Sequence, residues 1–349
     1  MLGAVGRIVV LLALIVLPVG PGARVEAKVD RLERFRELVG LLDPSTAEEP
    51  ASVETLHPIY ALLDAEIIES LTSGGVFATP AFIRDRLEAF TETWGGVTMR
   101  LVSLGRLLIV AYQFSETPLG SSVRIYGGRA REEKVLAVLA GPGWPNIRPL
   151  SSGVSGAAPF LVVWEGPPLA HGARPLRVDL VREGDGSVRA TWSSADAFPD
   201  GLTAQWYAVR GSDLTVRHPA YYPGWSPGCD QQTEHEDLYR LAPNGMRFAR
   251  VSRRAINAWH RDLHATAARL FEALAADDPA ALTRLVRDPA LRARLPRTLR
   301  SEPACDSRPG SDGTVSIAAR AASRQPWTLT FRGKGKGDWQ LTAAMPTIR

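Results

Sequence analysis

The chain has 349 residues, of which 45% are hydrophobic and 22% are charged, and its formal net charge is +4. This composition is typical of a folded protein with two or three domains and excludes a chain that is disordered throughout. The net charge falls to +3 when Arg7, Arg24 and Glu26 are removed with residues 1–27, and this excess is too small to indicate nucleic-acid binding.

The first 27 residues predict a cleavable secretory signal peptide. Arg7 precedes an apolar run from Ile8 to Leu17, and Val25 and Ala27 fit the positions that precede a cleavage site. The run is shorter than the roughly 20 residues that span a bilayer, and no later segment is apolar enough to do so. We therefore expect a periplasmic or secreted protein with no membrane span after cleavage. An uncleaved anchor is the alternative.

Residues 28–96 predict a helical N-terminal segment. Apolar residues recur at helical spacing within residues 32–42 and again within residues 59–71. Thr79 and Pro80 then provide the N-cap and the first position of a further helix. Helices of this size have too little apolar surface to fold alone, so we expect them to pack on a larger part of the chain.

Residues 97–252 predict an antiparallel β domain. Short runs of β-branched and aromatic residues alternate with turn residues and form about three similar meanders, which repeat every 50–60 residues or so. Their strand runs are 107–114, 123–126 and 134–139, then 160–165, 176–180 and 188–192, then 204–209, 238–241 and 246–251. This period is typical of propeller blades, but three blades do not close a propeller. An open arc and a sandwich therefore both remain possible.

Residues 255–349 predict a small α+β domain, which makes the whole chain an α+β protein. An apolar stripe over residues 256–274 indicates a long helix. Two Asp-Pro pairs, at 278–279 and 288–289, each begin a short helix. Strands follow at 314–319, 327–331 and 339–342.

This C-terminal part resembles the nuclear transport factor two-like (cystatin-like) fold. The resemblance lies in the long helix, the sequence LFEALAADDPAAL at 270–282 and the final strand with DWQL at 338–341, and it covers about 90 residues. It implies a helix packed on an antiparallel sheet. The segment is short for the family and has few strands, which implies a shallow pocket or none. The family contains both enzymes and non-catalytic modules, so the resemblance does not decide the function.

The chain has only two cysteines, Cys229 and Cys305. In an oxidising compartment such a pair predicts one disulfide, and two free buried thiols are the alternative. Two cysteines alone do not make a metal site, because a structural zinc ion needs about four ligands.

Residues 218–239 contain the densest set of binding side chains. Tyr221, Tyr222 and Trp225 lie in a segment rich in Pro and Gly, and polar residues follow at Asp230, Glu234, His235, Glu236 and Asp237. Aromatic rings beside carboxylates suit stacking on a sugar ring or docking of a cationic group. The alternative is a long loop whose aromatic side chains cover the sheet and whose carboxylates face water.

His260 and His264 lie four residues apart on the predicted long helix, a spacing that lets two imidazoles reach one metal ion. Arg261 stands where a metallopeptidase helix has its catalytic Glu, and no third ligand is evident nearby in the sequence. The sequence therefore favours a solvated helix flank, and we predict no metal, no cofactor and no catalytic residue.

The sequence as a whole predicts an exported, non-catalytic binding or scaffold module. Residues 218–239 are its expected contact surface, and a carbohydrate or a protein is the expected partner. The alternative is an extracytoplasmic hydrolase that uses the carboxylates at 230–237. A hydrolase requires these carboxylates to converge in a cleft with at least one raised pKa.

Overall fold

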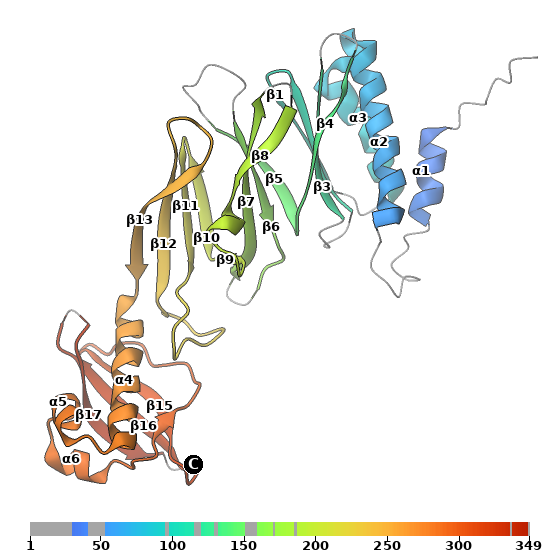
Figure 1. Cartoon of the computed structure of the whole chain (residues 1–349). Coiled ribbons are helices and arrows are strands. Elements are labelled where there is room, and N and C mark those ends of the chain that lie inside the picture. The colour runs from blue at the N-terminus through green and yellow to red at the C-terminus, as the bar shows by residue number, and fades with distance from the viewer. Residues whose placement is uncertain are drawn as a thin grey trace, which may run out of the picture.

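Figure 1 shows the chain as a computed structural model. The structure describes residues 30–40, 53–94, 98–114, 120–128, 132–150, 159–169, 172–184, 187–335 and 337–347. Within these residues the protein is a mixed α+β structure with four antiparallel sheets. The predicted signal peptide lies outside the described residues. None of the described helices is both long and apolar enough to cross a membrane.

The helices belong to two groups, one before the first strand and one after β13. They are α1 (Arg31–Gly40), α2 (Val53–Ser73), α3 (Pro80–Trp94), α4 (Ala258–Ala276), α5 (Pro279–Leu285) and α6 (Pro289–Arg294), with 3₁₀ turns η1 (Gly75–Ala78) and η3 (Ser194–Asp196). The hydroxyl of Thr79 accepts a hydrogen bond from the backbone N–H of Phe82 at 3.3 Å, which confirms Thr79 as the N-cap of α3.

Each sheet is an antiparallel meander in which neighbouring strands follow one another in the chain, except for one short strand of the second sheet. The first sheet contains β1 (Thr98–Leu104), β2 (Leu107–Gln113), β3 (Ser121–Gly127) and β4 (Lys134–Ala140). The second contains β5 (Trp144–Pro149), β6 (Phe160–Glu165), β7 (Arg174–Gly184) and β8 (Ser187–Ser193), and β9 (Leu202–Ala204) pairs with β7. The third contains β10 (Trp206–Arg210), β11 (Asp213–Pro219), β12 (Glu234–Leu241) and β13 (Phe248–Ile256), and the fourth contains β14 (Arg300–Ser301), β15 (Thr314–Arg320), β16 (Pro326–Gly333) and β17 (Trp339–Pro346).

The first three sheets and the N-terminal helices are stacked as successive layers (Figure 1). On β2, Leu108 and Val110 pack with the helices α1–α3, while Ile109 faces the second sheet. On β6, Val162 faces the first sheet and Leu161 faces the third. Successive side chains of a strand point to opposite faces. Both faces of a strand between two layers are buried, which explains the uninterrupted apolar runs at 107–112 of β2 and 160–164 of β6.

The C-terminal part has a core of its own. Leu263, Leu270 and Leu274 of α4 pack on Ile317 and Phe331 of the fourth sheet. Two short helices extend this core, and Asp278 caps the first of them by accepting hydrogen bonds from the backbone N–H groups of residues 280 and 281, each at 3.0 Å. In Figure 1 this part lies at one end of the third sheet, to which the direct passage from β13 into α4 joins it.

The predicted meanders are confirmed in the first three sheets, with several differences from the sequence analysis. The sequence analysis assigns no strand to the segments that form β1 and β5, and its run 204–209 covers the end of β9 and most of β10. The segment from Asp213 to Pro219 forms β11, although the sequence analysis assigns no strand there. Ile256, placed on the long helix by the apolar stripe, is instead the last residue of β13. The helix begins at Ala258 because Asn257 adopts a left-handed conformation, with φ of 51°, that ends the strand.

Candidate functional site

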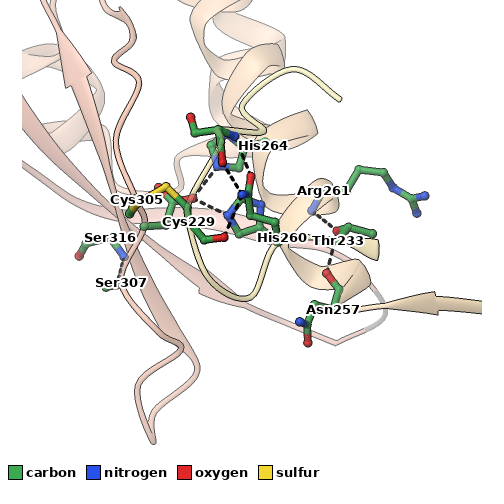
Figure 2. Close-up of polar contacts among 12 residues, drawn as sticks. Cys229, Thr233, Asn257, His260, Arg261, His264, Cys305, Ser307 and Ser316 are labelled. Atoms are coloured by element: carbon green, nitrogen blue, oxygen red, sulfur yellow. Dashed lines mark hydrogen bonds and ion pairs between the residues drawn. A yellow bond between two sulfur atoms is a disulfide. The ribbon is translucent and has the colours of Figure 1, made fainter. Parts of the chain in front are cut away.

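Three segments from distant parts of the sequence meet where the third sheet joins the C-terminal part (Figure 2). They are residues 220–233, which we call the 220–233 loop and which connect β11 to β12, the first turns of α4, and residues 302–313, which precede β15. The predicted disulfide is present between Cys229 of the loop and Cys305, with their Cα atoms 5.2 Å apart. Ser307 binds the third segment to β15, because its hydroxyl accepts a hydrogen bond from the backbone N–H of Ser316 at 2.9 Å.

Beside this disulfide lies a buried group of three side chains, His260, His264 and Asp306, which we call the two-histidine centre. The Nε2 atoms of both histidines approach the same carboxylate oxygen, Oδ2 of Asp306, at 2.9 Å from His260 and 2.6 Å from His264. All three side chains are at most 7% exposed. The histidines are therefore not the solvated helix flank that the sequence favours, because the 220–233 loop and the 302–313 segment cover this side of α4.

Tyr222 fixes the orientation of His260. Its hydroxyl lies 2.6 Å from Nδ1 of His260 and accepts a hydrogen bond from the backbone N–H of Thr233 at 3.1 Å. Thr233 in turn joins the loop to the start of α4, because its hydroxyl donates to the carbonyl oxygen of Asn257 and accepts from the backbone N–H of Arg261. Burial raises the pKa of Tyr222, so the phenol stays protonated at neutral pH.

Gly224 gives the 220–233 loop its close approach to His264. Its φ is 95°, and a Cβ atom at this position would lie 1.9 Å from Nδ1 of His264. A side chain at residue 224 would be strained by the backbone conformation and would also overlap the imidazole. The glycine therefore allows the loop to cover the centre.

Asp306 is the acidic member of the two-histidine centre. Burial of its carboxyl opposes ionisation, but the hydrogen bonds and charge of the two histidines outweigh burial and lower the pKa of Asp306. An ionised carboxylate facing two imidazole nitrogens can do two things chemically. It can hold the loop, helix and segment together by hydrogen bonds, or the three groups can share a cation.

A cavity of about 610 Å³ lies between the 220–233 loop and the second and third sheets, and we call it the Trp225 pocket. The rings of Tyr221 and Trp225 meet edge to face at its wall, with centroids 4.7 Å apart. Its polar lining includes two arginine–carboxylate pairs, Arg217 with Glu234 and Arg308 with Asp230, and several amide side chains. The lining amides are Gln205, Gln231, Gln232 and Asn257.

The structure divides the predicted binding residues among different places. Tyr221, Trp225, Asp230 and Glu234 line the Trp225 pocket, whereas Tyr222 points toward the two-histidine centre. Within the part of the chain that the structure describes, His235 and Glu236 do not line that pocket.

The carboxylates at 234–237 belong to the strand β12, where arginines of adjacent strands pair with them. Glu236 lies 2.8 Å from Arg254, and Asp237 accepts two hydrogen bonds from Arg253, each at 2.7 Å. Each carboxylate thus has its own arginine, and within the described residues these carboxylates do not converge on one point.

Asp306 is the residue that the sequence analysis does not identify. The spacing of the two histidines is visible in the sequence, but their third partner lies 42 residues beyond His264. The sequence offers one signal for Asp306, namely its position next to Cys305. The predicted disulfide brings the segment that contains both residues to the 220–233 loop. The sequence does not show, however, that this loop lies over α4.

No model of a known protein family matches the chain, and a search of curated proteins finds no match either. The function is therefore inferred from the residues and geometry of this chain alone.

Proposed function

We propose that the protein is an exported, non-catalytic binding module and that the Trp225 pocket is its ligand site. The observation that carries this proposal is the cavity itself. Its volume of about 610 Å³ is in the range of small-molecule sites, and two aromatic rings and several amide side chains line it. The disulfide supports export, since such bonds persist in oxidising compartments.

A carbohydrate is the ligand class that best fits this lining. Trp225 and Tyr221 offer flat apolar faces, and the amides of Gln205, Gln231 and Asn257 offer both donors and acceptors for hydroxyl groups. The amide of Gln232 is already hydrogen-bonded to backbone groups of the 220–233 loop. The two arginines are each paired with a carboxylate, so the pocket carries no unbalanced charge that would favour an ionic ligand. The hydrolase alternative gains no support from the geometry, because each predicted catalytic carboxylate is paired with an arginine.

The same proposal includes a division of the chain into three parts. The helices of residues 28–96 and the meanders of residues 97–252 form layers, which fits an open propeller-like arc. Residues 255–349 form a part of nuclear transport factor two-like type, supported by the packing of α4 on the four-stranded sheet. The ligand pocket then lies where the second and third parts meet.

Binding to an array of immobilised oligosaccharides tests the proposal. We expect the chain to bind a subset of these sugars and expect Trp225→Ala to weaken that binding by about 2 kcal/mol, roughly thirtyfold in Kd, as for a central aromatic contact. Phe77→Ala is the matched control, because Phe77 is an exposed aromatic residue, 48% accessible, on η1 in the N-terminal part. It should bind as the unaltered chain does.

Two outcomes contradict the proposal. One is that the unaltered chain binds none of the sugars, and the other is that Trp225→Ala binds as well as Phe77→Ala does. Circular dichroism of both variants ensures that a loss of binding is not a loss of folding.

A further inference from the structure

The two-histidine centre is not needed for a carbohydrate ligand, because the residues described as lining the Trp225 pocket include neither histidine nor Asp306. It nevertheless concentrates three ionisable side chains in a nearly closed space. Burying such groups is costly unless they are paired or bind a metal. Its contacts therefore call for an explanation of their own.

We propose that His260, His264 and Asp306 bind a divalent transition-metal ion, with Zn²⁺ as the foremost candidate. Two imidazoles and one carboxylate form a ligand set that such ions favour. One ligand atom from each residue lies within 4.8 Å of the other two. The ligands come from a helix and from a segment held by a disulfide, so their relative positions are restrained before an ion arrives.

The distances are close to those of a metal site. With bonds of about 2.0–2.1 Å and tetrahedral angles, two ligand atoms of a zinc ion lie roughly 3.3 Å apart. The Nε2 atoms lie 2.9 and 2.6 Å from Oδ2 of Asp306. Lengthening these two separations by about 0.4 and 0.7 Å brings them to that value.

Tyr222 supports the metal-bound state through the other nitrogen of His260. An imidazole that binds a metal through Nε2 carries its hydrogen on Nδ1 and donates it to a neighbouring acceptor. The hydroxyl oxygen of Tyr222 lies 2.6 Å from Nδ1 and is such an acceptor. This contact holds the ring with Nε2 directed at Asp306.

A fourth ligand has room beside the three side chains. A cavity of about 180 Å³ is lined by His260, Asp306, Trp259 and Gln231, among others. This volume admits water molecules, since one water occupies about 30 Å³ in the liquid. A site with three protein ligands and one solvent position is the arrangement of zinc sites that exchange a ligand, whereas closed structural sites use four protein ligands.

The competing explanation is that the three side chains form only a hydrogen-bonded clamp. In that state the Tyr222 hydroxyl donates to Nδ1 of His260, and both Nε2–H groups donate to Asp306. Such a clamp is complete without an ion and does not respond to chelators. Metal content and metal-dependent stability therefore separate the two explanations.

The test uses the purified full-length chain with its disulfide formed, treated with EDTA and then equilibrated with Zn²⁺, or with Co²⁺ as a spectroscopic probe. We expect one bound ion per chain by elemental analysis, visible absorption bands from Co²⁺, and a melting temperature that rises with Zn²⁺ concentration. Both cysteines are in the disulfide and so do not compete for the ion.

Variants assign the ion to this site. Asp306→Asn and the double variant His260→Gln/His264→Gln should lose the ion and the Co²⁺ bands. Tyr222→Phe should weaken binding by about 10–100-fold, as for other contacts that orient a ligand. His235→Gln is the matched control, because His235 lies on β12 and is not part of the two-histidine centre. It should bind the ion as the unaltered chain does.

The proposal is overturned if the folded, unaltered chain binds no more Zn²⁺ than the double variant does. It is also overturned if His235→Gln loses the ion. If the double variant does not fold, Tyr222→Phe provides the decision, because it removes one hydroxyl and keeps all three ligands. An affinity for Zn²⁺ equal to that of the unaltered chain would then contradict the proposed geometry. None of these measurements uses a sugar, so the result is independent of the carbohydrate proposal.

Discussion

Asp237 shows how the third sheet tolerates a buried charge at the level of one residue. Its carboxylate is fully buried and accepts two hydrogen bonds from Arg253, while Nε2 of His218 lies 3.3 Å away. Burial favours the neutral form, but Arg253 outweighs it and lowers the pKa of Asp237. The ion pair therefore contributes stability at neutral pH.

This contribution should disappear in acid. A carboxyl whose pKa is lower in the folded than in the unfolded chain stabilises the fold fully above its unfolded pKa, about 3.9 for Asp, and loses that effect as the pH falls through the folded pKa. We expect Asp237→Asn to reduce the free energy of unfolding at pH 7 by about 1–3 kcal/mol and to flatten its fall below about pH 4. Urea unfolding between pH 3 and pH 7 measures both effects.

The matched control for this prediction is Asp213→Asn. Asp213 pairs with Arg240 at the surface of the same sheet, where solvent weakens the interaction, so the change at pH 7 should be smaller. Equal acid profiles for Asp237→Asn and the unaltered chain would contradict the assignment.

At the level of elements, the sequence predicts most strands of the first three sheets but not the position of the carboxylates. The strands β2 and β6 lie between two layers and contain uninterrupted apolar runs, so they are easily recognised. The strand β12 begins with Glu234, His235, Glu236 and Asp237, a composition that is unfavourable in strands and typical of loops. Arginines on the neighbouring strands compensate for these charges, and sequence spacing alone does not show which arginine lies opposite which carboxylate.

The candidate site was predictable to a similar degree. Composition and the expected compartment predict the disulfide, and composition also points to the aromatic residues. The Trp225 pocket lies beside these residues. The two-histidine centre depends on how the 220–233 loop lies over α4. Gly224 permits this arrangement, but a glycine in the sequence does not predict it. Spacing along a helix predicts two ligands, whereas the third ligand is set by tertiary structure.

The stacking of sheets makes a quantitative prediction for β2. Ile109 is fully buried between the first and second sheets, whereas Val138 of β4 is 49% exposed. We expect Ile109→Ala to lower the free energy of unfolding by about 2–5 kcal/mol, as for other large-to-small changes in a core. Val138→Ala should change it by less than about 0.5 kcal/mol, since exposed substitutions have small effects. Similar losses for both variants, measured by urea unfolding, would show that the two sheets do not share a core.

At the level of the whole molecule, the layered sheets and the C-terminal part meet at a junction that the disulfide closes. The layered sheets and the C-terminal part each have their own set of buried residues. Their connection depends on the passage from β13 to α4 and on the contacts between the 220–233 loop and residues 302–313. Parts with separate cores can unfold separately. The disulfide between residues 76 positions apart is therefore expected to protect mainly the C-terminal part.

Replacing both cysteines, as Cys229→Ser/Cys305→Ser, tests this expectation. In the chain-entropy model, a disulfide that closes a loop of this length stabilises the fold by about 4–5 kcal/mol. This is an upper value for the C-terminal part, because the closed loop also contains β12 and β13. We expect amide hydrogens of α4 and β15–β17 to exchange faster in the variant, while those of β2 and β6 keep their protection, because the layered cores contain neither cysteine. Ser307→Ala is the control, since it removes a hydrogen bond of the same segment and leaves the disulfide in place. Hydrogen exchange followed by mass spectrometry resolves these regions, and a uniform loss of protection along the chain would mean that the sheets and the C-terminal part unfold as one unit.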